Sequence, residues 1–376
     1  MAFAAVAVGT FMSTLDASVV NVALPTLAHE LGAGLGAVEW VVLSYLLALV
    51  GLQLNAGRVS DLLGRGRIYA VGLGIFAAAS AACAAADSLA GARALQGVGG
   101  AMMGAIGPAI LVDVYPPERR GTVLGWMGLA VSAGLAAGPA IGGLVIDALS
   151  WRWIFLPNVP LAGLAALAVL RAAPPDRAGD ARFDPAGSLL LALGLAALAL
   201  ALSLAARRGP GDPLVLALAG CVPAVGLLFV AVERRHPAPV IDPALFRDRV
   251  FAGSAAAGFL IFVTVGAVNL VMPFFLADVH RLSTGHMGIV LSALPLALAA
   301  AAPVAGRAAD RTGAARAIAT CGALAATSAL AALALFGTRA GPGTIAACLA
   351  GVGLAIGTFQ SPNNATLMGA VPRERL

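Results

Sequence analysis

The chain has 376 residues, of which 60% are hydrophobic and only 11% are charged, and its mean hydropathy is +0.94. Soluble globular domains usually contain about a quarter of charged residues, so this composition excludes an ordinary soluble protein. The formal net charge is +5, and every basic residue is an arginine. Because these arginines lie in short polar segments between apolar runs, orientation in a membrane explains them better than nucleic-acid binding.

Twelve apolar runs follow one another along the chain, and each is long enough to cross a bilayer core as a helix. Lipid offers no hydrogen bonds to an exposed backbone, so helices are expected, and the alternating pattern of a barrel strand is absent. We therefore predict an all-α, polytopic membrane protein. Its spans are expected at about 3–28, 38–57, 68–87, 91–115, 121–147, 153–171, 185–206, 213–233, 250–277, 287–306, 316–337 and 343–368.

The arginines are distributed unequally between alternate connectors. Arg58, Arg119, Arg234 and Arg311 belong to the arginine-rich set, whereas the opposite set contains few, such as Arg152. Cytoplasmic connectors carry the excess of basic residues, so this asymmetry predicts a cytoplasmic N-terminus. With the excess of Ala and Gly, it indicates a multi-pass protein of a bacterial plasma (inner) membrane.

Three short segments recur in the same order along the chain. Residues 57–67 match 306–316, at an offset of 249 residues; residues 21–25 match 269–273; and residues 116–119 match 372–375. Such internal repeats are typical of transporter folds. They predict a six-helix N-terminal half at 1–171, an inserted two-helix linker at 172–249, and a C-terminal half at 250–376. Only four of six helices are expected in that C-terminal half, so its last two would be missing.

Five motifs in order resemble the major facilitator superfamily, and specifically its fourteen-helix drug:proton antiporter group. They are Leu15–Pro25, Gly57–Arg67, Arg93–Gly99, Gly134–Gly143, and Trp151–Phe155 followed by Asn158–Pro160. The resemblance implies a major facilitator fold with two homologous helical halves plus the inserted helix pair. It also implies a secondary transporter that exports small hydrophobic compounds, drugs or toxic metabolites, in exchange for protons by alternating access.

Asp16 and Arg93 are charged residues within apolar runs. A charged side chain at the centre of a membrane helix costs on the order of 2.5–3.5 kcal/mol on insertion scales, so such residues are usually functional. We predict that Asp16 carries the proton or pairs with a cationic substrate; the alternative is a structural carboxylate. The resemblance implies proton coupling for Arg93, and the alternative is an arginine that extends outward to the membrane interface. The repeat places Thr264 opposite Asp16, so coupling is expected in the N-terminal half.

Three further groups of residues are candidates for the transport path. Polar residues of the predicted cavity are Asn21, Gln53, Gln96, Asn269, Gln360, Asn363 and Asn364, each of which could instead join helices, and Pro362 suggests a broken helix there. By resemblance, a hinge or seal forms at Gly134, Gly138, Pro139, Gly142 and Gly143, with tight helix packing as the alternative. A cytoplasmic gate is expected at Gly57, Arg58, Asp61, Gly64, Arg65, Arg67, Gly306, Arg307, Asp310 and Arg316.

The sequence contains no nucleotide-binding loop, metal-ligand cluster or nucleophile–base set, so we expect no cofactor, no metal and no enzymatic activity. The expected partners are a small hydrophobic substrate, protons and the lipid bilayer, without nucleic acid; an accessory periplasmic or envelope partner is left unspecified. One alternative is an exporter of a single native metabolite or antibiotic. Alternatives of other classes are a non-transporting sensor or receptor, an inactive fragment, and a membrane-embedded enzyme.

Overall fold

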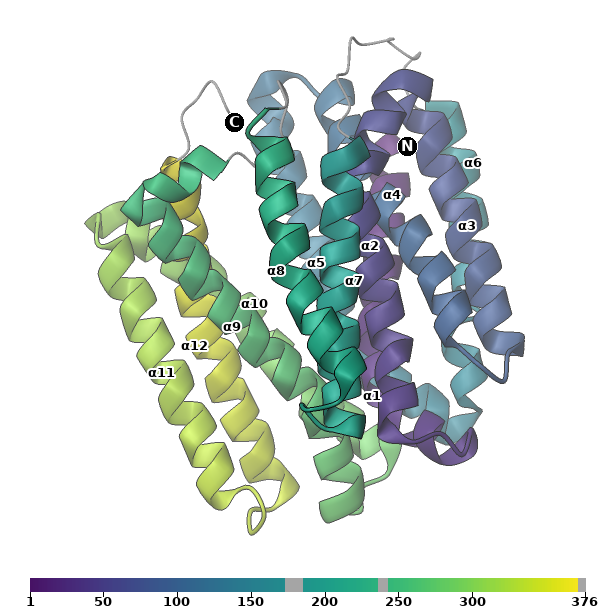
Figure 1. Cartoon of the computed structure of the whole chain (residues 1–376), viewed down its shortest axis with the longest axis vertical. Helices are drawn as coiled ribbons and strands as arrows, with labels where there is room; N and C mark the ends of the chain where they lie inside the picture. The colour runs from purple at the N-terminus through teal and green to yellow at the C-terminus, as the bar shows by residue number, and fades with distance from the viewer. Residues whose placement is uncertain (173–184, 236–242, 371–376) are drawn as a thin grey trace. The chain divides into compact units, whose positions relative to one another are not determined.

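The computed structural model describes residues 1–172, 185–235 and 243–370, and within these ranges the chain is helical (Figure 1). Short 3₁₀ turns lie at Trp151–Ile154 and Pro243–Arg247, and a π-helical turn at Phe275–Val279 follows α9. The long helices are α1 (Ala2–Glu30), α2 (Leu35–Leu63), α3 (Arg65–Ala85), α4 (Ala90–Val114), α5 (Pro117–Ala148), α6 (Asn158–Ala172), α7 (Pro185–Arg208), α8 (Pro213–Glu233), α9 (Arg249–Phe274), α10 (Thr284–Thr312), α11 (Ala315–Phe336) and α12 (Pro342–Gly369).

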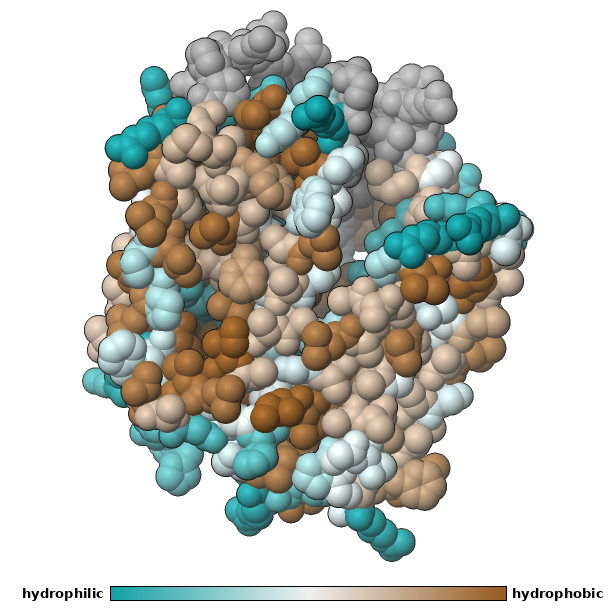
Figure 2. Space-filling model, turned by 180° about the vertical axis from the view of Figure 1, so that it is seen from behind, coloured by the Kyte–Doolittle hydropathy of each residue, from teal (hydrophilic) through white to brown (hydrophobic). Residues whose placement is uncertain are grey.

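The described part of the chain has twelve helices that are long and apolar enough to span a membrane, which confirms the predicted all-α membrane fold. Large apolar side chains remain exposed on them: Leu227 of α8 is 73% exposed and Leu202 of α7 is 65% exposed. On the face shown in Figure 2, brown apolar residues cover most of the surface between teal hydrophilic residues at the upper and lower ends. Such a surface is stable against lipid tails and unstable against water.

The structure divides into two compact units. Unit 1 comprises Met1–Thr14, Leu27–Val131 and Trp151–Asp242, and unit 2 comprises Leu15–Thr26, Ser132–Ser150 and Pro243–Leu376. Helices α1 and α5 therefore each contribute one segment to each unit. This division describes which segments pack together, and the repeat-based halves 1–171 and 250–376 remain a prediction about homology.

The bounds of the helices follow the offset of the sequence repeat. Helix α10 has 29 residues, like α2, and it begins and ends 249 positions later. Gly64, which follows α2, and Gly313, which follows α10, both have positive φ angles, of 102° and 65°. Glycine adopts this conformation without a steric penalty, so both copies use it to separate two helices. In unit 1, α7 and α8 form a hairpin, and α7 packs against α2 (Figure 1).

Two expectations about helix ends were wrong. The segment that begins at Gly57 is helical as far as Leu63, so most of the expected loop is the last turns of α2. Helix α12 is also continuous through Pro362, rather than broken there. A proline removes one backbone hydrogen bond, and a long helix anchored by packing on both sides tolerates that loss within a membrane protein.

Candidate functional site

Arg93 is the centre of a buried polar network in unit 1. Its side chain is only 1% exposed, and its Nε donates a hydrogen bond to the Val41 carbonyl at 3.1 Å. One terminal nitrogen donates to Oε1 of Gln96, and the guanidinium lies 4.3 Å from the centre of the Tyr45 ring. The alternative in which Arg93 extends to the interface is therefore wrong, because its charge is held inside the helix bundle.

The network continues from Gln96 to α3 and α6. Gln96 donates from Nε2 to the Ser80 hydroxyl at 2.9 Å, and Asn158 of α6 donates to the same hydroxyl at 3.3 Å. Ser80 in turn donates to the Phe76 carbonyl at 2.7 Å. Gln96 thus supports Arg93 within a packed core. Sequence reasoning missed Tyr45 and Ser80, which carry no motif signal of their own.

Small residues allow α4 to approach its neighbours closely enough for this network. A Cβ at Gly97 would collide with the Tyr45 carbonyl oxygen of α2, and a Cβ at Gly99 would lie 2.6 Å from the Gly72 carbonyl oxygen of α3. Helix association in lipid depends on van der Waals packing because no hydrophobic driving force acts between helices. The glycines of α4 therefore fix the positions from which Arg93 and Gln96 reach their partners.

Unit 2 contains a cavity of about 160 Å³ between α1, α5, α9 and α10. Asn21 and Asn269, which the repeat pairs at an offset of 248 residues, both line it. The remaining walls are mainly apolar, with Val22, Leu294 and Val265 among them. Asp16 is 3% exposed and directly precedes Ala17, a lining residue. Asp16 also has an interaction partner of its own, so it is not an isolated carboxylate.

Prolines place backbone acceptors around this cavity. A proline within a helix cannot donate to the carbonyl four residues earlier. Pro139, Pro273 and Pro295 all line the cavity, and so do Leu135, Asn269 and Leu291, the residues four positions before them. The Leu135 carbonyl is satisfied by the Ser18 hydroxyl of α1 at 3.0 Å. The carbonyls of Asn269 and Leu291 lose their helical donor in the same way, and Asn21 and Asn269 contribute amide side chains to the residues that line the cavity.

The glycine motif of α5 presents two faces within unit 2. Gly138 and Gly142 face α1, where added Cβ atoms would lie 2.6 Å from Ser18 and Val19 side-chain carbons. Gly143 faces α10, where a Cβ would collide with the Thr284 carbonyl oxygen, and Gly134 is buried. Tight packing and a hinge or seal need the same small residues, so this geometry is compatible with both interpretations.

Polar contacts join the same ends of α1, α5 and α10. The Asp147 carboxylate of α5 accepts a hydrogen bond from the Gly285 backbone N–H at 2.8 Å, in the first turn of α10. The Thr26 and Thr284 hydroxyls lie 3.3 Å apart. An acidic side chain at a helix N-terminus is favourable because the unpaired N–H groups there carry partial positive charge. These contacts hold the three helix ends together in the observed state.

The predicted gate residues form an ion cluster in the first repeat. Arg65 contacts the Asp61 carboxylate at 2.8 Å and the Asp113 carboxylate at 2.7 Å. Asp61 does not cap α3, because Gly64 occupies the N-cap position and no side chain makes a capping hydrogen bond there. Sequence reasoning missed Asp113, although its position in the last turn of a predicted span was a signal.

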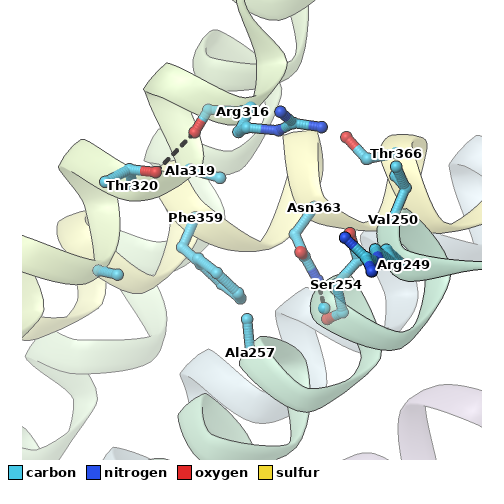
Figure 3. A pocket seen from close by; sticks show the side chains of 12 residues that line it. Arg249, Val250, Ser254, Ala257, Arg316, Ala319, Thr320, Phe359, Asn363 and Thr366 are labelled. Atoms are coloured by element: carbon cyan, nitrogen blue, oxygen red, sulfur yellow. Dashed lines mark hydrogen bonds between the residues drawn. The ribbon is translucent and has the colours of Figure 1, made fainter.

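The second repeat differs from the first at the same positions. Arg307, Asp310 and Arg316 are exposed, and the described residues show no ion pair among them. Position 314, which corresponds to Arg65, is an alanine. Arg316 instead lines a separate hollow with Asn363 (Figure 3). The repeated sequence signature therefore does not produce a repeated charge cluster.

The other predicted residues are distributed over both units. Gly57 faces Ala105 of α4, Gln53 faces Gly104, and Gly306 faces Ser361 of α12. Arg58 is exposed, Arg67 has an interaction partner, Gln360 is half-buried and Asn364 is exposed. Pro372–Arg375 of the third repeat match lies outside the described residues. Within the described ranges, no group of three or more His, Cys, Asp or Glu residues could hold a metal ion.

The family model described as Major Facilitator Superfamily matches residues 6–376. The chain belongs to this superfamily. A major facilitator is a secondary transporter of small molecules rather than an enzyme. The buried charges and the cavity described above are candidates for a transport path.

Curated relatives of this major facilitator are bacterial. The riboflavin transporter RibZ of Clostridioides difficile is 30% identical over 375 residues, which cover 98% of this chain and 81% of RibZ. The uncharacterised transporter YebQ of Escherichia coli is 33% identical over 375 residues, or 82% of its length. The putative multidrug resistance protein MdtD of Escherichia coli is 35% identical over 298 residues, or 78% of this chain and 62% of MdtD.

Solved structures share the fold at low sequence identity. A bacterial homologue of the human lysosomal transporter Spinster, in an inward-facing and unoccupied conformation, has a TM-score of 0.68 at 17% identity over 97% of this chain and 74% of its own. A POT family transporter in complex with 5-aminolevulinic acid has a TM-score of 0.70 at 15% identity over 99% of this chain and 84% of its own. These likenesses concern the fold alone.

Proposed function

We propose that this major facilitator is a proton-coupled exporter of small hydrophobic compounds, of the fourteen-helix drug:proton antiporter group. The proposal places it in a bacterial plasma membrane with a cytoplasmic N-terminus. The MdtD relatives are named putative multidrug resistance proteins, and that name supports this substrate class. The five motifs in the sequence support the group, and the arginine asymmetry supports the orientation.

One observation carries the proposal: a buried carboxylate adjoins a largely apolar cavity. Asp16 is 3% exposed and directly precedes the lining residue Ala17, on the helix that also supplies Asn21 to the cavity wall. Charged residues within membrane helices are usually functional, and carboxylates there form part of proton relays. In this proposal Asp16 carries the proton, and the conformational cycle exposes it to alternate sides of the membrane.

The cavity volume supports alternating access. A pocket that binds a drug-sized molecule usually has about 300–1,000 Å³, whereas this cavity has about 160 Å³. The observed state is thus too narrow for such a substrate. Binding requires α1 and α5 to separate from α9 or α10, and the contacts of Asp147 and Thr26 are the ones that must break at their end of the bundle.

Replacing Asp16 with Asn tests the coupling. The amide preserves the size of the side chain but cannot exchange a proton at physiological pH, so we expect export driven by a proton gradient to fall by at least tenfold. The measurement is dye or drug transport in everted membrane vesicles, with and without an uncoupler.

The matched control is Asp87→Asn, because the Asp87 side chain is 98% exposed and its contact with Arg152 is long, at 3.7 Å. This variant should transport at the wild-type rate. If Asp16→Asn also transports normally and remains sensitive to the uncoupler, Asp16 is not the coupling residue.

A second candidate is the export of a single native metabolite. RibZ, which matches nearly the whole chain, is named a riboflavin transporter. The amide groups of Asn21 and Asn269 and the carbonyls near the prolines give the cavity several fixed hydrogen-bonding positions. Such positions favour one polar heteroaromatic compound over many lipophilic ones. Competition between riboflavin and a panel of lipophilic dyes in the same vesicles distinguishes the two candidates.

A further inference from the structure

The proposed function gives no role to the last of the five sequence motifs, residues 151–160. Trp151 and Phe155 are both fully buried, and their rings meet edge to face with centroids 6.4 Å apart. The Trp151 indole N–H donates to the Glu30 carboxylate of α1 at 2.9 Å. These contacts anchor the 3₁₀ turn of unit 1 that shortly precedes α6. The motif therefore fixes the place at which Asn158, the first residue of α6, enters the bundle.

Asn158 is buried although it begins a helix. It is 3% exposed, and its amide nitrogen donates to Oγ of Ser80, a fully buried residue of α3, at 3.3 Å. A buried amide is unfavourable unless it is hydrogen-bonded, so this contact matters for the position of the side chain. Helix α6 packs on α3, and the hydrogen bond therefore lies at a helix contact within unit 1.

The Ser80 hydroxyl has no hydrogen-bonding position left. A serine hydroxyl provides one donor and two acceptor positions. Ser80 donates its proton to the Phe76 carbonyl at 2.7 Å, and it accepts from Asn158 and from Nε2 of Gln96, the latter at 2.9 Å. Because its single proton is used on Phe76, Ser80 cannot donate to Gln96. The Gln96 amide must therefore turn its NH₂ group toward Ser80.

This orientation decides what Gln96 presents to Arg93. With Nε2 on Ser80, Oε1 is the atom that accepts from a terminal nitrogen of Arg93. The Cys83 thiol also donates to Oε1, at 3.9 Å. A flipped amide would set its N–H groups against those of the guanidinium, and a buried charged donor would lose this acceptor at a high energetic cost. The hydrogen bonds from α6 to α4 therefore have one favourable direction.

We infer that Asn158 and Ser80 are positioning residues for Arg93. Ser80 orients the amide of Gln96, and Asn158 occupies the second acceptor position of Ser80, so the motif at the start of α6 controls a charge on α4. Both residues act through Gln96. The inference rests on the proposed function in one respect, which is that Arg93 takes part in proton coupling.

The position of Arg93 can be measured without transport. Its Nε–H is buried and donates to the Val41 carbonyl at 3.1 Å, so it should exchange slowly with water. NMR of the full chain in detergent, with isotope-labelled arginine, measures this exchange, and the resonance is identified by its loss in Arg93→Lys. Ser80→Ala and Asn158→Leu should each speed the exchange roughly tenfold, the factor that corresponds to about 1.4 kcal/mol, which is the order of one hydrogen bond to a charged group.

Transport in proteoliposomes measures the consequence, with ethidium and riboflavin as separate probes. Ser80→Ala and Asn158→Leu should each lower proton-driven export roughly tenfold for the same reason. Exchange of labelled for unlabelled probe without a proton gradient should stay close to the wild-type rate, because it needs no net proton movement. In a Gln96→Met background neither variant should lower export further, since both act through that amide.

Ser44→Ala is the matched control. The Ser44 hydroxyl donates to the Trp40 carbonyl four residues earlier, at 2.6 Å, as Ser80 does to Phe76. Among the described residues, however, the structure shows no hydrogen bond from Ser44 to another helix. This variant should leave both the exchange of the Arg93 Nε–H and the export rate unchanged.

Three outcomes decide the inference. Wild-type protection of the Arg93 Nε–H in both Ser80→Ala and Asn158→Leu overturns it. An equal fall of export and probe exchange also overturns it, because the two residues would then only support the fold. Loss of protection with unchanged proton-driven export supports the positioning of Arg93 and contradicts its proposed part in proton coupling instead.

Discussion

At the scale of single residues, the pairing of Ser18 with Pro139 shows how this membrane protein satisfies its backbone. Pro139 has no N–H, so the Leu135 carbonyl lacks its helical donor, and the Ser18 hydroxyl of α1 donates to that carbonyl at 3.0 Å. Gly138 lies next to the same serine and leaves room for it, since a Cβ there would be 2.7 Å from the Ser18 Oγ. The carbonyl that Pro139 leaves without a helical donor is therefore satisfied by a specific partner on α1.

A double-mutant cycle tests this pairing. Ser18→Ala leaves a buried carbonyl without a partner and should cost about 1 kcal/mol of unfolding free energy in detergent, because interhelical hydrogen bonds have roughly that value. Pro139→Ala restores the helical N–H, so in that background Ser18→Ala should cost close to nothing. The measurement is reversible unfolding in mixed micelles. Equal costs in the two backgrounds would contradict the assignment of Ser18 as the replacement donor.

At the scale of elements, the association of α1, α5 and α10 is the contact on which the proposed alternating access depends. Gly143 and Gly288 bring α5 and α10 into direct backbone contact, since a Cβ at Gly288 would collide with the Pro139 carbonyl oxygen. The Ser292 hydroxyl also accepts a hydrogen bond from the Ala140 backbone N–H at 3.1 Å. Two helices in such close contact have few intermediate arrangements, so α5 and α10 are either packed together or separated.

A reversible crosslink tests whether this interface must open. Thr26 and Thr284 have hydroxyls 3.3 Å apart, so the Thr26→Cys/Thr284→Cys variant should form a disulfide with little backbone movement. We expect oxidation to stop transport and reduction to restore it. Each single cysteine variant, which carries the same native cysteines, should transport under both conditions. Transport by the fully crosslinked protein at the wild-type rate would exclude opening between α1 and α10.

At the scale of the whole molecule, the proposed antiport couples a gradient of protons to a gradient of substrate. The sequence contains no nucleotide-binding loop, so the proposed energy source is the proton gradient. One proton that moves through ~100 mV supplies about 2.3 kcal/mol. This energy sustains a substrate gradient of roughly 40-fold, because about 1.4 kcal/mol corresponds to a tenfold ratio.

Steady-state accumulation in everted vesicles of known membrane potential checks this limit. For an uncharged substrate exchanged with one proton, the ratio should not exceed about 40-fold at ~100 mV, and its logarithm should rise linearly with the potential. A slope twice as large would indicate two protons. Accumulation that persists after both the potential and the pH difference across the membrane are collapsed would contradict proton coupling altogether.

Part of the candidate site was predictable because it depends on local chemistry. Asp16 and Arg93 are charges within apolar spans, and charges there are too costly to be incidental. The pairing of Asn21 with Asn269 was also suggested by the repeat, and both residues line the cavity. Tyr45, Ser80 and Asp113 were missed because each becomes informative only when a partner from another helix lies beside it.

The sequence by itself determined that the protein lies in lipid, where its membrane spans are, and to which family it belongs. The spans were predictable because a long apolar run has only one stable structure in lipid, the helix. It could not determine whether two segments with the same sequence signature make the same contacts. Residues 57–67 and 306–316 share their signature, yet among the described residues only the first copy builds an ion cluster, since Asp113 of α4 completes it and the position of Arg65 is Ala314 in the second copy. The tertiary structure also decided that Arg93 lies inside the bundle and that Arg316 lines a separate hollow with Arg249. The physical reason is that the environment of a charge is set by helices distant in sequence, whose approach depends on small residues and not on the charge itself.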